Sequence, residues 1–135
     1  MDLESSLITS ASGMKAQSAR MRIVAENIAN EKTTPSSAKE DPYKRKTIAF
    51  REVMDRSTGA RVVEVSKIAR DDAPFRSVYD PGNKAANANG QVALPNVNLS
   101  VEMADMMEAQ SAFEANMTAA EASRAMLLKT LDLMR

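Results

Sequence analysis

The chain has 135 residues with 18 basic and 18 acidic side chains, so no net charge favours binding to nucleic acid or to an anionic membrane. It has no Cys and no His, which excludes disulfides, thiolate nucleophiles and the usual ligands of zinc, haem and iron–sulfur clusters. No apolar run reaches the length of about 18 residues that a transmembrane helix needs, and the N-terminus lacks the pattern of a cleavable secretory signal. We therefore expect no cofactor, no metal and no direct membrane insertion.

Residues 1–30 have the pattern of an amphipathic helix, with apolar side chains at alternating steps of three and four. These are Leu3, Leu7, Met14, Met21, Val24 and Ile28, with Ser10 and Gln17 as polar members of the same register. Asp2 or Ser5 is suited to be the N-cap, and Asn30 is suited to end the helix in a left-handed conformation. Gly13 is either a tolerated weak point or a place where a neighbouring helix approaches closely.

Residues 31–96 hold all five prolines and three of the four glycines, which excludes long helices from this part of the chain. The stretch 33–42 is predicted to be an exposed, mobile loop because it has almost nothing to bury. Short β-branched or alternating runs predict strands, which are Thr47–Phe50, Val62–Val65 and Phe75–Tyr79. With turn signals at 57–59, 80–83 and 89–90, the sequence predicts a small β-hairpin or meander.

Residues 97–135 contain no proline and no glycine and predict one long helix, with Asn98 or Ser100 as its N-cap. Its apolar stripe has heptad spacing and comprises Met103, Met106, Phe113, Met117, Ala120, Leu127, Leu131 and Met134, with Gln110 and Arg124 in the polar positions. A helix of roughly 35 residues is roughly 50 Å long, which exceeds the diameter of a domain of this size. Such a stripe needs partners outside the chain.

The sequence contains no arrangement of residues that indicates catalysis. Asp71 and Asp72 form an adjacent acidic pair, and a solvated turn explains them better than acid–base chemistry. The basic run at 43–46, YKRK, is typical of a solvated strand edge that discourages aberrant pairing. Gly82 and Gly90 lack the spacing and the Lys-Ser/Thr of a phosphate-binding loop. We therefore predict that the protein is not an enzyme.

Two classes of function remain for a mainly α protein with a small β insert between two long terminal helices. In the first class, the helices pack against copies of the chain or related chains in a tube or fibre. In the second, the protein is a soluble helical-hairpin adaptor or regulator whose helices close on each other. The two helices are unequal in length, which leaves apolar surface for neighbours and favours the assembly class.

Segments near both ends of the chain resemble the bacterial flagellar axial proteins. The segment AENIANEKT carries an Asn-Ile-Ala-Asn-x-x-Thr signature that occurs near the N-terminus of that family, and its matching positions are Asn27, Ile28, Ala29, Asn30 and Thr33. The stretch 80–98, followed by EMADMMEAQSAFEAN, resembles the proximal-rod members of the family, and its matching positions are Asp80, Pro81, Gly82, Gly90, Pro95, Asn96, Val97 and Asn98. The chain departs from the family pattern at Asn83-Lys84 and at Gln91.

The resemblance implies that residues 1–30 and 97–135 pack as a coiled-coil-like helical pair in the inner layer of a rod, with residues 31–96 forming outer contacts. It implies a structural subunit of the proximal rod of the flagellar basal body, exported by the flagellar type III apparatus without a cleaved signal. Its expected neighbours are other rod proteins, the junction protein between rod and export gate, and copies of itself. Asn27 and Asn30 are expected either to hydrogen-bond a partner helix or subunit or simply to cap the helix, and Asn96 and Asn98 carry the same two interpretations.

Overall fold

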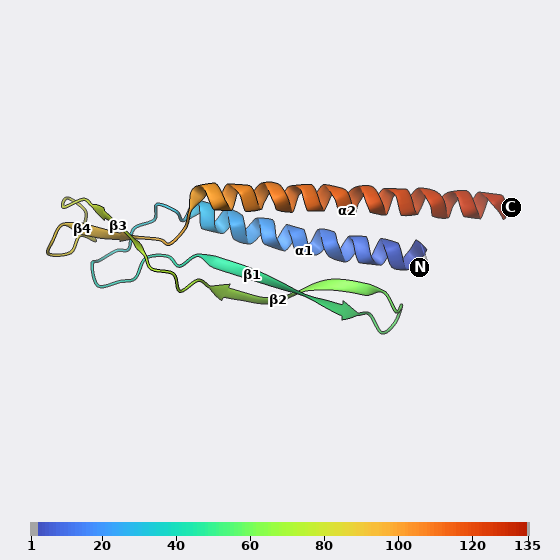
Figure 1. Cartoon of the computed structure of the whole chain (residues 1–135), viewed down its shortest axis with the longest axis horizontal. Helices are drawn as coiled ribbons and strands as arrows, with labels where there is room; N and C mark the ends of the chain where they lie inside the picture. Colours follow the sequence, from blue (N-terminus) through green and yellow to red (C-terminus); the bar gives the residue numbers. More distant parts are fainter. Residues whose placement is uncertain (1–2, 135) are drawn as a thin grey trace. The chain divides into compact units, whose positions relative to one another are not determined.

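The structure is a computed structural model that describes residues 3–134 (Figure 1). Its elements, in chain order, are α1 (Leu3–Ala29), β1 (Lys46–Met54), β2 (Arg61–Arg70), β3 (Arg76–Tyr79), β4 (Gln91–Leu94) and α2 (Leu99–Leu133). The predicted fold class is confirmed, because two long terminal helices pack together and two small antiparallel hairpins lie between them in sequence. The proposed N-cap Asp2 and the terminal Arg135 lie outside the described residues.

The chain divides into two compact units, each built from three separate segments. Unit 1 comprises the chain up to Met21, Ile48–Lys67 and the chain from Met107 onward. Unit 2 comprises Arg22–Thr47 and Ile68–Met106. Each helix therefore contributes to both units, and each unit contains a stretch of α1 beside a stretch of α2.

In unit 1, α1 and α2 run antiparallel and meet through small side chains (Figure 1). The buried residues of this unit are Ser10, Ala16, Ala60, Ala109 and Ser123. A Cβ atom added at Gly13 would lie 2.8 Å from Oδ1 of Asn116, so the second interpretation of Gly13, a close approach of a neighbouring helix, is confirmed. Small residues thus allow the two backbones of unit 1 to approach closely.

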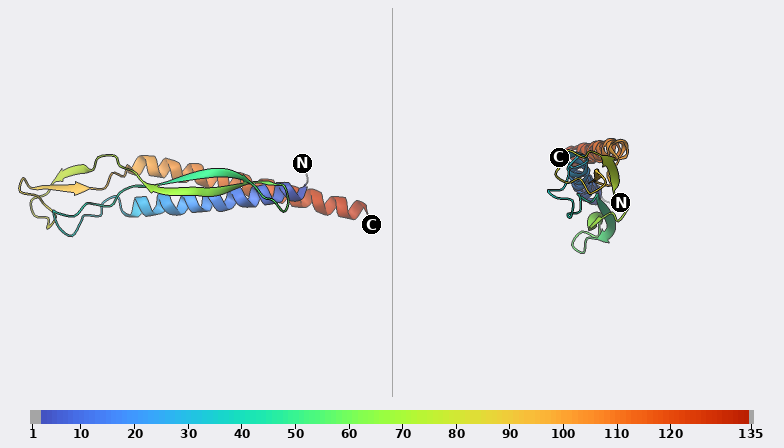
Figure 2. Two further views of the ribbon diagram at one scale, coloured as in Figure 1. Left: turned by 90° about the horizontal axis from the view of Figure 1, so that it is seen from below. Right: turned by 90° about the vertical axis from the view of Figure 1, so that its left-hand side faces the viewer.

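The hairpin of β1 and β2 lies along α1 in unit 1, as two views agree (Figures 1 and 2). The Thr9 hydroxyl donates a hydrogen bond to the Arg61 carbonyl at 2.8 Å, and the Ser12 hydroxyl oxygen accepts one from the Val63 amide at 3.1 Å. Both strands are longer than the sequence predicted. Two-residue periodicity was visible only in their centres, and pairing across the hairpin extends them.

The turn of this hairpin confirms the signal at residues 57–59. Gly59 has a φ of 69°, and its amide donates to the Asp55 carbonyl at 2.7 Å. The Asp55 carboxylate accepts hydrogen bonds from the amide and the hydroxyl of Ser57, at 2.8 Å and 2.6 Å. These bonds from Ser57 lower the pKa of Asp55 below its ordinary value, because they stabilise the charged carboxylate.

Unit 2 contains the second hairpin, in which β3 and β4 pair antiparallel from Arg76 opposite Leu94 to Tyr79 opposite Gln91. The sequence analysis predicted no strand at β4, which is a four-residue segment between turn formers. Gly90 has a φ of 74°, and a Cβ atom there would lie 2.8 Å from the Tyr79 ring, so this turn requires glycine for two reasons. The apolar core of this unit comprises Ile23, Val24, Ala85, Val92 and Val97.

The predicted cap at the start of α2 is confirmed, whereas the conformation predicted at the end of α1 is wrong. Asn98 is the N-cap of α2, because its Oδ1 accepts hydrogen bonds from the amides of Ser100 and Val101 at 3.0 Å and 3.4 Å. The left-handed conformation predicted for Asn30 is wrong, since no described residue other than glycine has a positive φ. Instead, the Asn30 side chain donates to the Glu26 carbonyl at 2.8 Å and satisfies one of the terminal acceptors of α1.

Candidate polar junction and assembly surface

Asn27 lies near the end of α1 and is 1% exposed, in the interior of unit 2. Its Nδ2 donates to the Lys46 carbonyl at 2.8 Å and to Oε2 of Glu102 on α2 at 3.0 Å. Its Oδ1 accepts from the Tyr43 hydroxyl at 2.8 Å and from the Lys46 amide at 2.9 Å. An amide side chain can make at most four such bonds, and Asn27 makes all of them. It therefore joins α1, the segment that leads into β1, and α2.

Glu102, in the first turn of α2, is fully buried and binds two side chains. One oxygen accepts from Asn27, and the other accepts from Nε of Arg45. The Arg45 guanidinium also lies 3.4 Å from Asp105 and 3.7 Å from Asp71, and 22% of its side chain is exposed. Burial opposes the charge of Arg45, but the hydrogen bond to Glu102 and the three carboxylates outweigh burial and raise the pKa of Arg45 above its ordinary value.

Asn96 attaches the segment before α2 to two other segments of unit 2. Its Oδ1 accepts from the Arg45 amide at 2.8 Å, and its Nδ2 donates to the carbonyls of Asp71 and Ala73, each at 3.0 Å. We call the cluster of Asn27, Tyr43, Arg45, Asp71, Asn96, Glu102 and Asp105 the polar junction. Asn27 and Asn96 both bind within their own chain, and neither acts as a simple helix cap.

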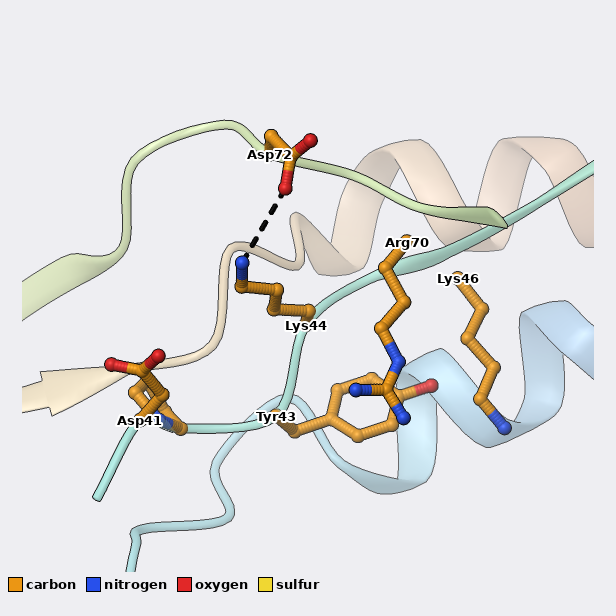
Figure 3. A pocket seen from close by; sticks show the side chains of 7 residues that line it. Asp41, Tyr43, Lys44, Lys46, Arg70 and Asp72 are labelled. Carbon is orange, nitrogen blue, oxygen red and sulfur yellow. Dashed lines mark hydrogen bonds and ion pairs between the residues drawn. The ribbon is translucent and has the colours of Figure 1, made fainter. Parts of the chain in front are cut away.

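A surface hollow of about 440 Å³ adjoins the polar junction and is lined by Asp41, Pro42, Tyr43, Lys44, Lys46, Arg70 and Asp72 (Figure 3). Lys44 pairs with Asp72 at 3.4 Å, and Lys46 pairs with Glu26 at 2.7 Å. Burial, followed by the charges of Glu26 and Glu102, raises the pKa of Tyr43, so its hydroxyl keeps its proton and remains a donor to Asn27. The hollow thus borders on groups already engaged in the fold.

The structure corrects the interpretation of the basic run at 43–46 as a solvated edge. Tyr43 and Arg45 face inward and belong to the polar junction, and Asp71, expected in a solvated turn, approaches Arg45. Glu102 was interpreted only as a favourable charge in the first turn of a helix. The sequence offered no signal for this contact, because Glu102 lies 75 residues after Asn27.

The apolar stripe predicted on α2 is largely exposed in this chain. Exposed fractions are 52% for Met103, 42% for Met117, 36% for Leu127 and 54% for Leu131, whereas Met106 and Phe113 are half-buried. Further exposed apolar side chains lie on the same helix, namely Leu99, Val101, Met107, Met126, Leu128 and Leu133, and the predicted stripe member Met134, directly after the helix, is also exposed. We call the exposed members of α2 from Met117 onward the apolar face of unit 1.

On α1 the predicted stripe is more covered. Val24 is buried, and the other members are half-buried, namely Leu3, Leu7, Met14, Met21 and Ile28. The residues of α2 that face α1 are instead one position away from the predicted stripe, at Glu102, Ala109, Asn116 and Ser123. The two helices therefore pair as predicted, but small and polar side chains form their contact.

The remaining signature residues shape the turns of unit 2. Thr33 donates to the Asn30 side chain at 3.3 Å, and the Asp80 carbonyl accepts from the Asn83 amide at 3.2 Å in a turn that contains Pro81 and Gly82. Pro95 and Val97 are buried, and the Pro95 carbonyl accepts from Arg76 at 3.2 Å. Ile28 is half-buried and Ala29 is exposed.

Within residues 3–134, no three or more carboxylate, His or Cys groups are arranged to hold a metal ion. In the same part of the chain, no helix is both long and apolar enough to cross a membrane.

Comparison with known proteins identifies similarity at both ends of the chain and over most of its length. Residues 7–34 match the family described as flagella basal body rod protein, and residues 88–133 match the C-terminal family of the flagellar basal body rod proteins FlgEFG. The chain is 44% identical to the flagellar basal-body rod protein FlgC of Agrobacterium fabrum, over 92% of this chain and 89% of that protein. It is 36% identical to FlgC of Bacillus subtilis, over 95% of each chain, and 36% identical to FlgC of Salmonella typhimurium, over 90% of each.

Proposed function

We infer that this chain, which belongs to the FlgC family of flagellar basal-body rod proteins and is a structural subunit of the proximal rod, assembles through the apolar face of unit 1. The protein is a structural component and not an enzyme, and family membership replaces the alternative of a soluble adaptor. The observation that carries the assembly mode is the exposure of Met117, Leu127 and Leu131 on a helix already paired with α1.

The segment of α2 after Ser123 supports this assignment. Ser123 is buried and meets Ser6 of α1 at 3.0 Å, whereas every described residue from Arg124 to Met134 is exposed. Six of these exposed residues have large apolar side chains: Met126, Leu127, Leu128, Leu131, Leu133 and Met134. Apolar side chains grouped in this way mark interaction surfaces, because burying them against a neighbour removes apolar area from water.

The neighbours that fit this surface are other rod proteins and copies of this chain, with residues 1–30 and 97–135 in the inner layer of the rod and 31–96 in outer contacts. The junction protein between the rod and the export gate is a further proposed partner. Methionine suits a surface that meets unlike partners, since its flexible side chain adapts to different shapes. Close helix packing of this kind would transmit torque along the rod.

We further propose that the chain reaches the rod through the flagellar type III export apparatus without cleavage of a signal. The chain contains no cysteine, so it forms no stray disulfide in an oxidising compartment. Mass spectrometry of the chain from isolated basal bodies tests this directly, because an uncleaved subunit retains the residues at its N-terminus.

Substitution of apolar residues on α2 tests the assembly mode. We expect Phe113→Asp and Leu127→Asp to abolish motility and rod assembly while the chain is still synthesised, because Leu127→Asp places a charge in the apolar face of unit 1 and Phe113→Asp places one at a half-buried position of the same predicted stripe. Leu127 is exposed in the chain itself, so its substitution leaves the fold intact. Ser111→Asp adds the same charge at an exposed position outside the stripe and is the matched control. Normal swimming of the Leu127→Asp strain would contradict the proposal.

A further inference from the structure

We propose that a series of polar and small side chains sets the register in which α1 and α2 pair. The facing positions on α1 recur every seventh residue, and those on α2 do so except at Glu108, which lies next to the buried seventh-residue position Ala109. They are Ser6 with Ser123, Gly13 with Asn116, Arg20 with Glu108, and Asn27 with Glu102. We call these pairs the register layers, of which the first three belong to unit 1 and the last to unit 2.

In each of the first three register layers, the residue of α1 fits the residue that faces it on α2. The Ser6 and Ser123 hydroxyls lie 3.0 Å apart, and two Arg20 nitrogens lie 3.3 Å and 3.4 Å from the Glu108 carboxylate. The Asn116 side chain, held by its own bond to the Ala112 carbonyl at 2.9 Å, occupies the space that the absent side chain of Gly13 leaves. These contacts combine hydrogen bonding, charge and shape.

The fourth register layer is the most demanding because both of its members are buried. Asn27 is 1% exposed and Glu102 is 0% exposed, and they meet at 3.0 Å. Sliding α1 by one heptad towards the C-terminus of α2 would place Asn27 opposite Ala109, which has no polar side chain. It would also leave the Asn27 amide without its acceptor in a buried site, which is costly. A buried polar residue in a heptad position is a well-established means of fixing register.

Apolar residues alone would not select one register. The stripe of α2 repeats methionine and leucine at similar spacing, so several alignments would bury similar apolar area. Because the register layers contain no large apolar side chain, they make the alignment specific without using Met117, Leu127 or Leu131. Asn27 is therefore a positioning residue for the helical pair.

Engineered disulfides in the purified full-length chain test this proposal, since the chain has no cysteine of its own. Ser6→Cys with Ser123→Cys reports the observed register. Ser6→Cys with Thr130→Cys reports a slip of one heptad, because those positions are about 10 Å further along the helix in the observed register. Disulfides require Cα atoms within about 7 Å. In a glutathione redox buffer, each variant gives an effective concentration of its two engineered thiols for each other. The measured quantity is this value for the Ser6→Cys, Ser123→Cys variant divided by the value for the Ser6→Cys, Thr130→Cys variant.

We expect the ratio to favour the observed register by more than about 100-fold in the parent chain, and Asn27→Leu to reduce it at least about tenfold. Asn30→Leu is the matched control, because the Asn30 side chain binds the Glu26 carbonyl of its own helix and the nearby Thr33 hydroxyl, both outside α2, and the ratio should keep its parent value. An unchanged ratio in Asn27→Leu would overturn the proposal. So would loss of both disulfides in that variant, since it would show that Asn27 serves stability without choosing a register.

Discussion

Replacing Arg45 with methionine removes the cation that binds the buried carboxylate of Glu102. Methionine keeps an unbranched side chain of similar reach, so the apolar part of the arginine is largely retained. Glu102 would then be fully buried without its counter-charge, with the Asn27 amide as its remaining side-chain partner among residues 3–134, and Asp105 and Asp71 would lose the guanidinium near them. The change therefore isolates the charge of Arg45 from its bulk.

The expected loss follows from the burial of the two partners. Removing one member of a buried ion pair costs about 3–5 kcal/mol, because the other charge stays in a site that water does not reach. Arg45 is 22% exposed, so water screens part of its interaction, and we expect a loss near the lower end, about 3 kcal/mol. At about 2 kcal/mol per M of urea, this loss lowers the unfolding midpoint by about 1.5 M.

Urea unfolding of the purified full-length chain, followed by far-ultraviolet circular dichroism, measures this midpoint. Arg51→Met is the matched control, since Arg51 pairs with Glu64 at 3.2 Å but the two side chains are 62% and 50% exposed. A surface pair of this kind contributes about 0–1 kcal/mol. Equal midpoints for the two variants would refute the account of the polar junction.

A double substitution separates the pair from its surroundings. The double variant, Arg45→Met with Glu102→Leu, leaves neither charge of this pair. We therefore expect its loss of unfolding free energy to be about 1–2 kcal/mol smaller than the sum of the losses of the two single variants. Strict additivity of the two single effects would show that Arg45 and Glu102 do not stabilise each other.

Two further predictions concern unit 1. Gly13→Ala is expected to lower the free energy of unfolding by about 1–2 kcal/mol through overpacking against Asn116, and Asn116→Ala in the same chain should restore most of it; a failure of this rescue in urea unfolding would contradict the close approach. The bonds from Ser57 depress the pKa of Asp55, so their stabilising effect is present above the unfolded value of 3.8 and is lost as pH falls through the lower folded value. A nuclear magnetic resonance titration of the Asp55 carboxyl should therefore have its midpoint below 3.8, and a midpoint at or above this value would contradict the turn geometry.

Local signals in the sequence predicted much of the fold. The proline-free ends indicated the two helices, Asn98 indicated the start of α2, and Gly59 and Gly90 indicated the two hairpin turns. Each of these features depends on the conformational preference of one residue or on the periodicity of a short stretch. The structure therefore confirms them where the sequence analysis placed them.

The pairing of the two terminal helices was predicted, but the residues that make contacts between distant segments were not. Arg45 and Glu102 are far apart in the chain, and each alone resembles an ordinary surface charge. The contact face of α2 was also missed, because heptad analysis weights large apolar residues and the residues facing α1 are small or polar. Strand β4 was missed because four residues carry too little periodicity, and its pairing with β3 is what defines it.

Several polar side chains are buried in this chain, whereas several large apolar side chains of α2 are exposed. Asn27, Glu102 and Ser123 are buried, whereas Leu131 and Leu133 on α2 are exposed. Hydrogen bonds are directional, so they form in one alignment of the two helices, whereas apolar contacts are non-directional and form with many different partners. Within the chain, the specific contacts hold the two helices in place. The apolar area that remains can contribute stability only when a neighbour covers it, so the stability of this subunit is expected to rise with its incorporation into the rod.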